Sequence, residues 1–160
     1  MINEIGHFSL VLAFVLSVLT GTLPLFAIRR GWHSLAQLTI PATLVMAAAV
    51  ILSFAALVSA FLASDFSVAL VANHSHSAKP WIYKFSGTWG NHEGSLLLWI
   101  VILALFAALL AMGGRGMATG LKIRTLAVQA LTSAGFLAFC LFTSNPFARL
   151  DPPPVDGRGL

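Results

Sequence analysis

Four long apolar stretches separate the charged residues of this chain, and they constrain its fold more than any other feature. They run over about 5–28, 41–63, 95–112 and 125–143. A helix needs about 20 mostly apolar residues to cross a bilayer, and each stretch reaches or approaches that length. The sequence therefore predicts an all-α, polytopic integral membrane protein with four transmembrane helices in a single membrane domain, 1–160.

The composition supports a membrane protein and argues against a nucleic-acid-binding one. Hydrophobic residues make up 58% of the chain and charged residues only 9%, whereas soluble domains carry about 25% charged residues. The formal net charge is +4, but nine basic residues spread over short loops make a poor surface for tracking phosphates. The first stretch is no removable signal peptide, because its apolar part is too long and its positive charge follows it.

The charges of the loops predict an orientation. Two loops contain basic residues and no acid. The loop after the first stretch carries Arg29 and Arg30, and the loop after the third carries Arg115, Lys122 and Arg124. All five acids lie on the other side: Glu4, Asp65, Glu93, Asp151 and Asp156. Basic loops stay in the cytoplasm. We therefore expect both termini and the loop 64–94 to face the periplasm from a bacterial inner membrane.

The long loop 64–94 and the C-terminal segment differ from simple connections. The loop carries Trp81, Tyr83, Phe85 and Trp89, and because disordered segments are poor in aromatic residues we expect it to be ordered. The final "DPPPVDGRGL" is expected to be extended, since successive prolines exclude a helix. The chain stops there without an apolar anchor, which favours the N-terminal part of a longer protein.

The stretch "SGTWGNHEGSLLLW", 86–99, places polar residues where an apolar helix begins. With a helix starting near Gly90, Glu93 falls at the third helical position, where its carboxylate could reach free backbone N–H groups. Spacings of three and four put Trp89, His92, Glu93, Leu96 and Trp99 on one face. Two interpretations stay open: a capped helix with aromatic anchors, or a platform for a flat aromatic ligand or a partner.

Other candidate residues are isolated. His74 and His76 could ligate a metal from an extended loop, but Asp65 is the only third ligand of metal type nearby, so solvated loop histidines are favoured. His7 and His33 each stand alone. Cys140 is the only cysteine, which excludes an intrachain disulfide. The sequence contains no recognisable triad, P-loop or dinucleotide fingerprint, so we predict neither a catalytic residue nor a metal site.

At "VANHSHSAKPWIYKFSGTWGNHEGSLLLW", 71–99, the sequence resembles the CcmF family, the membrane haem lyase component of cytochrome c-type biogenesis. The segments "EIGHFSLVLAFVLS" and "FTSNPFARLDPPPVDGRGL" also resemble that family. The likeness covers essentially all 160 residues. The sibling haem lyase of the nitrite-reductase pathway shares much of this pattern.

The resemblance implies a function that the residue pattern alone does not reach. Family members are much longer, take haem from the periplasmic chaperone CcmE and attach it to the CxxCH thiols of apocytochrome c. They act with CcmH- and CcmI-type partners. The family's tryptophan-rich "WWD" segment is absent from this sequence, so the axial ligands of haem are expected beyond residue 160.

Within this chain, the resemblance implies scaffold and part of the periplasmic wall of the haem or partner site. The residues that match the family motif are Trp89, Gly90, His92, Glu93, Gly94 and Trp99. No catalytic residue is implied here, and the chain alone is expected to be inactive in haem ligation. The alternative is a structural or transporter-type membrane subunit, although the predicted spans lack the internal charges and broken helices typical of transporters.

Overall fold

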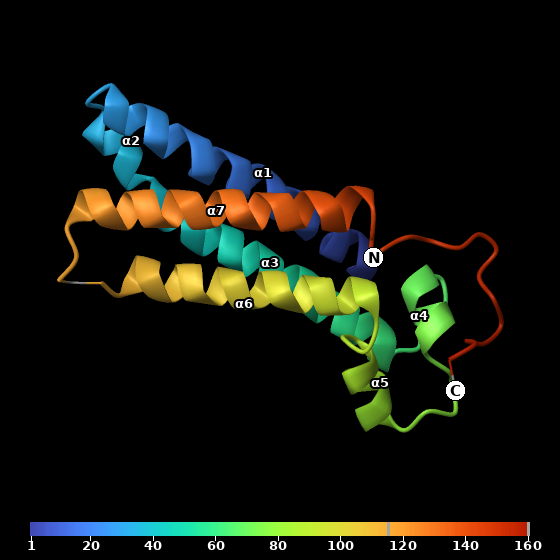
Figure 1. Cartoon of the computed structure of the whole chain (residues 1–160). Helices are drawn as coiled ribbons and strands as arrows, with labels where there is room; N and C mark the ends of the chain where they lie inside the picture. Colours follow the sequence, from blue (N-terminus) through green and yellow to red (C-terminus); the bar gives the residue numbers. More distant parts are fainter. Residues whose placement is uncertain (115, 160) are drawn as a thin grey trace.

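The computed structural model describes residues 1–114 and 116–159 and consists of four long helices lying side by side (Figure 1). These are α1 (Ile2–Arg29), α3 (Thr39–Leu62), α6 (His92–Met112) and α7 (Thr119–Phe142). All four are long and apolar enough to cross a membrane, α3 together with the short helix α2 (His33–Gln37) that precedes it. The prediction of an all-α protein with four transmembrane helices is confirmed. Arg115, one of the predicted loop charges, lies outside the described residues.

The helices begin earlier than the apolar stretches. Helix α6 starts at His92 and α7 at Thr119, where the hydropathy pattern placed them at about 95 and 125. The first turns of α7 are polar and still helical. There the Lys122 ammonium donates to the carbonyl oxygens of Ala111 at 2.7 Å and Gly113 at 2.8 Å, at the C-terminal end of α6. A cation at that end meets unpaired carbonyls and the negative end of the helix dipole.

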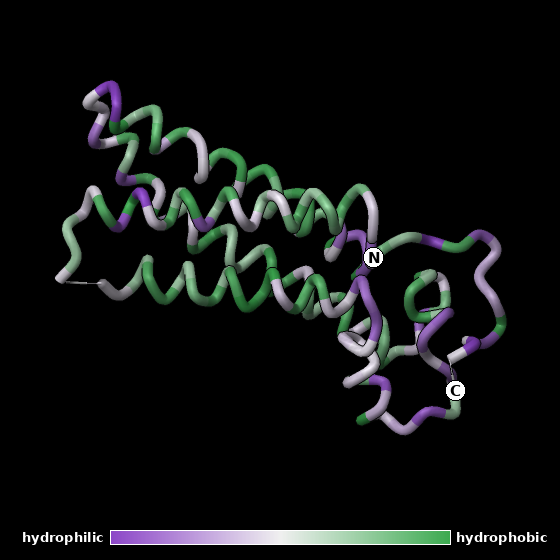
Figure 2. The backbone as a smooth tube through the Cα atoms, viewed as in Figure 1, coloured by the Kyte–Doolittle hydropathy of each residue, from purple (hydrophilic) through white to green (hydrophobic). Residues whose placement is uncertain are grey.

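Small residues let the long helices approach closely. A Cβ added to Gly21 of α1 would lie 2.6 Å from Cγ of Leu131 in α7, and one added to Gly6 would lie 2.8 Å from Cβ of Ala56 in α3. Close backbone approach is how helices associate in a bilayer, where apolar burial gives little driving force. Large apolar side chains, such as Phe106 and Phe142, remain exposed on the outside of the bundle. Figure 2 shows the helices as mostly hydrophobic and the connections as more polar.

A cross-helix hydrogen bond also joins α6 and α7 midway along their lengths. The Gln129 amide of α7 donates to the Leu103 carbonyl of α6 at 2.7 Å. Interhelical bonds of this kind are typical of membrane bundles. The bond gives α6 and α7 a fixed register beside each other.

Both ends of the described chain lie at the same end of the bundle as the loop 64–94 (Figure 1). This loop contains two short helices, α4 (Ala69–His74) and α5 (Trp81–Gly87). The segment after α7 runs back over α4: Val68 and Arg149 form an isolated antiparallel bridge, and the Arg158 N–H donates to the Ala72 carbonyl at 2.7 Å. Which side of a membrane this end faces stays a prediction.

Candidate functional site

A sharp corner joins α5 to α6, and one buried side chain holds it together. Asn91 is the N-cap of α6: its Oδ1 accepts a hydrogen bond from the Gly94 N–H at 2.7 Å. Its Nδ2 donates to the Gly87 carbonyl, the last residue of α5, at 2.8 Å. The same side chain thus satisfies a free N–H at the start of one helix and a free carbonyl at the end of another. The corner, defined as residues 87–94, is therefore fixed from both sides.

Gly94 is required by the close approach of the backbone inside this corner. A Cβ at this position would lie 1.6 Å from the Thr88 carbonyl oxygen and 3.0 Å from Oδ1 of Asn91. Both Thr88 and Gly94 are buried. No side chain fits there without moving backbone, so Gly94 has a structural reason to be part of the motif.

The predicted role of Glu93 as the cap is wrong. Helix α6 begins at His92, not near Gly90, so Glu93 is the second helical residue and Asn91 provides the cap. Glu93 still lies in the first turn, where a carboxylate meets the positive end of the helix dipole. Trp89 precedes the helix, so the expected shared helical face with His92 is also wrong for that residue.

The aromatic residues of the motif take two different surroundings. The ring of His92 is exposed and meets Phe139 of α7 edge to face, with ring centroids 6.2 Å apart. Trp89 packs against Phe85 of α5, with centroids 5.0 Å apart. Trp99 lies two helical turns beyond His92 and is 65% exposed. The structure therefore brings Trp89, Gly90, His92, Glu93 and Gly94 together at the corner, and leaves Trp99 about 10 Å along α6.

An open apolar groove of about 480 Å³ begins beside His92. It lies between α6 and α7 and is lined by Leu96, Thr132, Gly135, Phe136 and Phe139. No atom lies within 4 Å of a Cβ placed on Gly135, so the floor of the groove is open. Sequence reasoning missed this feature, because it needs the pairing of two helices. The spacing of Thr132, Phe136 and Phe139 could have indicated its α7 side.

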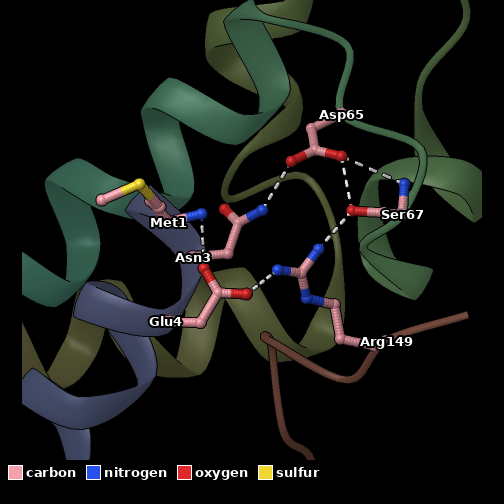
Figure 3. Close-up of polar contacts among 6 residues, drawn as sticks. All are labelled: Met1, Asn3, Glu4, Asp65, Ser67 and Arg149. Carbon is pink, nitrogen blue, oxygen red and sulfur yellow. Dashed lines mark hydrogen bonds and ion pairs between the residues drawn. The ribbon is translucent and has the colours of Figure 1, made fainter.

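A polar network closes the bundle at the same end. The Asn3 amide donates to the Asp65 carboxylate at 2.6 Å, and Asp65 accepts from the Ser67 hydroxyl at 2.6 Å (Figure 3). The Arg149 guanidinium donates to the Ser67 hydroxyl and pairs with Glu4. The Ser67 hydrogen bond lowers the pKa of Asp65. Three of its contacts join residues 62, 82 and 145 positions apart, so no local pattern could have predicted it.

The histidines do not assemble a metal site. His74 Nδ1 lies 3.1 Å from the Leu70 carbonyl, whereas His76 Nε2 lies 3.5 Å from the Asp156 carboxylate. Within 1–114 and 116–159, no three His, Cys, Asp or Glu side chains gather as metal ligands. His7 packs on Phe147, and His33 begins α2 at the end of the bundle opposite His92 (Figure 1).

Comparison with known proteins identifies relatives along the whole chain. No protein-family model matches it. It is 51% identical over 160 residues to the cytochrome c-type biogenesis protein CycK of Rhizobium meliloti, covering all of this chain and 24% of that protein. It is 46% identical over 164 residues to the cytochrome c-type biogenesis protein CcmF of Pseudomonas aeruginosa, again covering all of this chain and 24% of that protein.

A solved structure supports the same relationship. The structure of a cytochrome c haem lyase CcmF matches 92% of this chain and 25% of its own, with a TM-score of 0.84 and 27% identity. The chain spans about a quarter of the length of these relatives. The resemblance found in the sequence is confirmed: the chain is a homologue of the CcmF and CycK cytochrome c-type biogenesis proteins.

Proposed function

We propose that this chain forms scaffold and one wall of the site where a cytochrome c-type biogenesis protein receives haem. Haem is the substrate in this proposal, delivered by a CcmE-type chaperone and attached to the CxxCH thiols of apocytochrome c. CcmH- and CcmI-type proteins would handle the apocytochrome. The chain would lie in a bacterial inner membrane with the α5–α6 corner facing the periplasm.

The observation that carries the proposal is the rigid corner built around Asn91. It lies in a homologue of cytochrome c-type biogenesis proteins and presents Trp89 and His92 at one end of the bundle. Thioether formation needs haem held and oriented beside two thiols, so much of the catalysis is positioning. A wall whose backbone is fixed before the substrate arrives loses little conformational freedom on binding.

The side chains of the corner would contribute contacts, not haem ligation. His92 offers an exposed ring beside the apolar groove, and Trp89 offers an aromatic surface against Phe85 on the α5 side of the corner. Aromatic rings stack with flat conjugated molecules and also fill protein interfaces. Axial ligands would come from outside the residues of this chain.

The test uses substitutions in the full-length homologue that contains this segment. Trp89→Ala and His92→Ala are expected to lower the yield of covalent cytochrome c, measured by haem staining, and crosslinking to the haem chaperone. Trp32→Ala and His33→Ala are controls with the same pair of residue types, exposed at the opposite end of the bundle. Equal yields from both pairs, at equal membrane levels, would favour a scaffold without site contacts.

A further inference from the structure

Helix α5 exposes an apolar patch outside the four-helix bundle. Its members are the large side chains Trp81 (71% exposed), Ile82 (54%), Tyr83 (63%) and Phe85 (40%). We refer to these four residues as the α5 patch. Contiguous exposed apolar patches mark a contact with a partner or a membrane.

The opposite face of α5 is fastened to the bundle, so the patch has a defined direction. The Lys84 ammonium donates to the Ser64 hydroxyl, just after α3, at 2.7 Å. A Cβ on Gly87 would lie 3.6 Å from the Phe61 ring, in ordinary contact. Ile82 is two positions from Lys84, which places it on the far side of the helix. Ile82 therefore points away from the bundle, and the exposed side chains of Trp81, Tyr83 and Phe85 surround it on the helix.

The position of α5 matches the boundary between lipid and water. The helix runs crosswise to the bundle at the level of the N-terminal end of α6, and it projects beyond the flank of the bundle (Figure 1). A helix crosswise to membrane-spanning helices lies in the membrane plane. Further along α6, Trp99 and Ile102 are also exposed. Because α6 begins at His92 and is long and apolar enough to cross a membrane, a helix at the level of its first residue would lie near the headgroups.

The chemistry of the segment suits phospholipid headgroups. Trp and Tyr favour the membrane interface, where the ring meets apolar chains and the polar group meets water. Between Asp65 and Glu93 the only formally charged residues are Lys79 and Lys84. The Lys84 ammonium is held by Ser64 and the Lys79 ammonium by the His74 carbonyl, so their positive charge lies near the patch and attracts anionic lipid without direct contact.

We propose that α5 is an interfacial helix, with the α5 patch inserted in the headgroup layer of the leaflet at that end of the bundle. The occupant of the patch is phospholipid, not a protein. This would hold the corner, through the Phe85–Trp89 contact, at a fixed depth. The inference does not depend on the proposed function.

The test measures the surroundings of residue 82 in a bilayer. The full chain carrying Ile82→Cys and Cys140→Ala is labelled with a nitroxide and placed in nanodiscs of phosphatidylcholine and phosphatidylglycerol. Accessibility to oxygen and to a water-soluble nickel chelate is measured by electron paramagnetic resonance. Phe106→Cys provides the lipid reference on α6, and Val155→Cys provides the aqueous reference, as both side chains are exposed.

The expected result is an oxygen-to-nickel accessibility ratio at residue 82 shifted from the value at Val155 toward that at Phe106. Replacing the anionic lipid with neutral lipid should move the ratio back toward the aqueous reference. A ratio equal to that at Val155 would overturn the proposal. Protection from both reagents would also overturn it, because the patch would then be covered by protein.

Discussion

Replacing Gly94 with alanine tests the construction of the corner. The added Cβ would lie 1.6 Å from the Thr88 carbonyl oxygen, so backbone must move. Overpacking of this kind costs about 1–3 kcal/mol. The movement also threatens the bond between the Gly94 N–H and Asn91, and a lost N-cap costs about 1 kcal/mol. Alanine regains up to about 1 kcal/mol as the better helix former.

The net destabilisation of Gly94→Ala is therefore about 1–3 kcal/mol, which corresponds to a Tm lower by roughly 2–12 °C for a domain of this size. The assay is thermal unfolding of the full chain in nanodiscs, followed by circular dichroism. Gly135→Ala is the matched control, since nothing lies within 4 Å of its Cβ, and its Tm should rise or stay unchanged. An unchanged or raised Tm for Gly94→Ala would show that the corner accepts a Cβ at position 94 without a costly shift of the Thr88 backbone.

Further predictions concern the cap, the spans, the C-terminal segment and the substrate. Asn91→Ala should destabilise the chain by about 1–2 kcal/mol. Asn91→Asp should destabilise it at least as much, because it keeps the cap acceptor but sets a buried carboxylate oxygen against the Gly87 and Thr88 carbonyl oxygens, to which the amide donates. Thermal unfolding would measure both. Gln129→Leu should cost only about 0.6 kcal/mol in the same assay, the average for interhelical bonds in a bilayer. Hydrogen bonds from Ser77 lower the pKa of Asp156 to about 2. Because the pKa is depressed in the folded state, the hydrogen bonds between Ser77 and the Asp156 carboxylate should hold the C-terminal segment above pH 4. They should be lost as pH falls from about 4 to 2. Hydrogen exchange at the Arg158 N–H would report this loss, and Asp156→Asn should remove the pH dependence. The purified chain alone should show no stoichiometric Soret band on titration with haem, and such a band would contradict placing the axial ligands elsewhere.

The spans were predictable because hydropathy is a property of single segments. Four stretches of sufficient length specify four helices whatever their neighbours are, and the structure contains them. The helix ends were less predictable. The start of α7 depends on Lys122 reaching carbonyl oxygens of α6, a contact between residues on different helices. Hydropathy is averaged over a window of one segment, so it carries no information about a contact between two helices.

The corner shows a different limit of sequence reasoning. The motif around His92 and Glu93 marked the start of a helix correctly, yet the cap is Asn91, one residue before His92. Both Asn and Glu are favourable near a helix start, so composition alone does not choose between them. Asparagine suits the cap of this helix because its amide also donates to the Gly87 carbonyl, and glutamate has no such donor. That carbonyl belongs to α5, a helix the sequence analysis treated as loop.

The network around Asp65 and Arg149 was beyond any local pattern. Its residues come from the start of α1, the segment after α3 and the segment after α7 (Figure 3). They meet only because the four helices are antiparallel and place these segments at one end of the bundle. The same arrangement determines which residues lie near the corner.

The proposed function requires that the α5–α6 corner contact the haem-delivering partner. The most direct measurement places a photo-crosslinking amino acid at position 92 of the full-length homologue, in cells that make cytochrome c, and identifies what it captures. The account predicts a crosslink to the haem chaperone from position 92 and none from position 33, the exposed histidine at the opposite end of the bundle. Equal capture from both positions, or capture from position 33 alone, would contradict it.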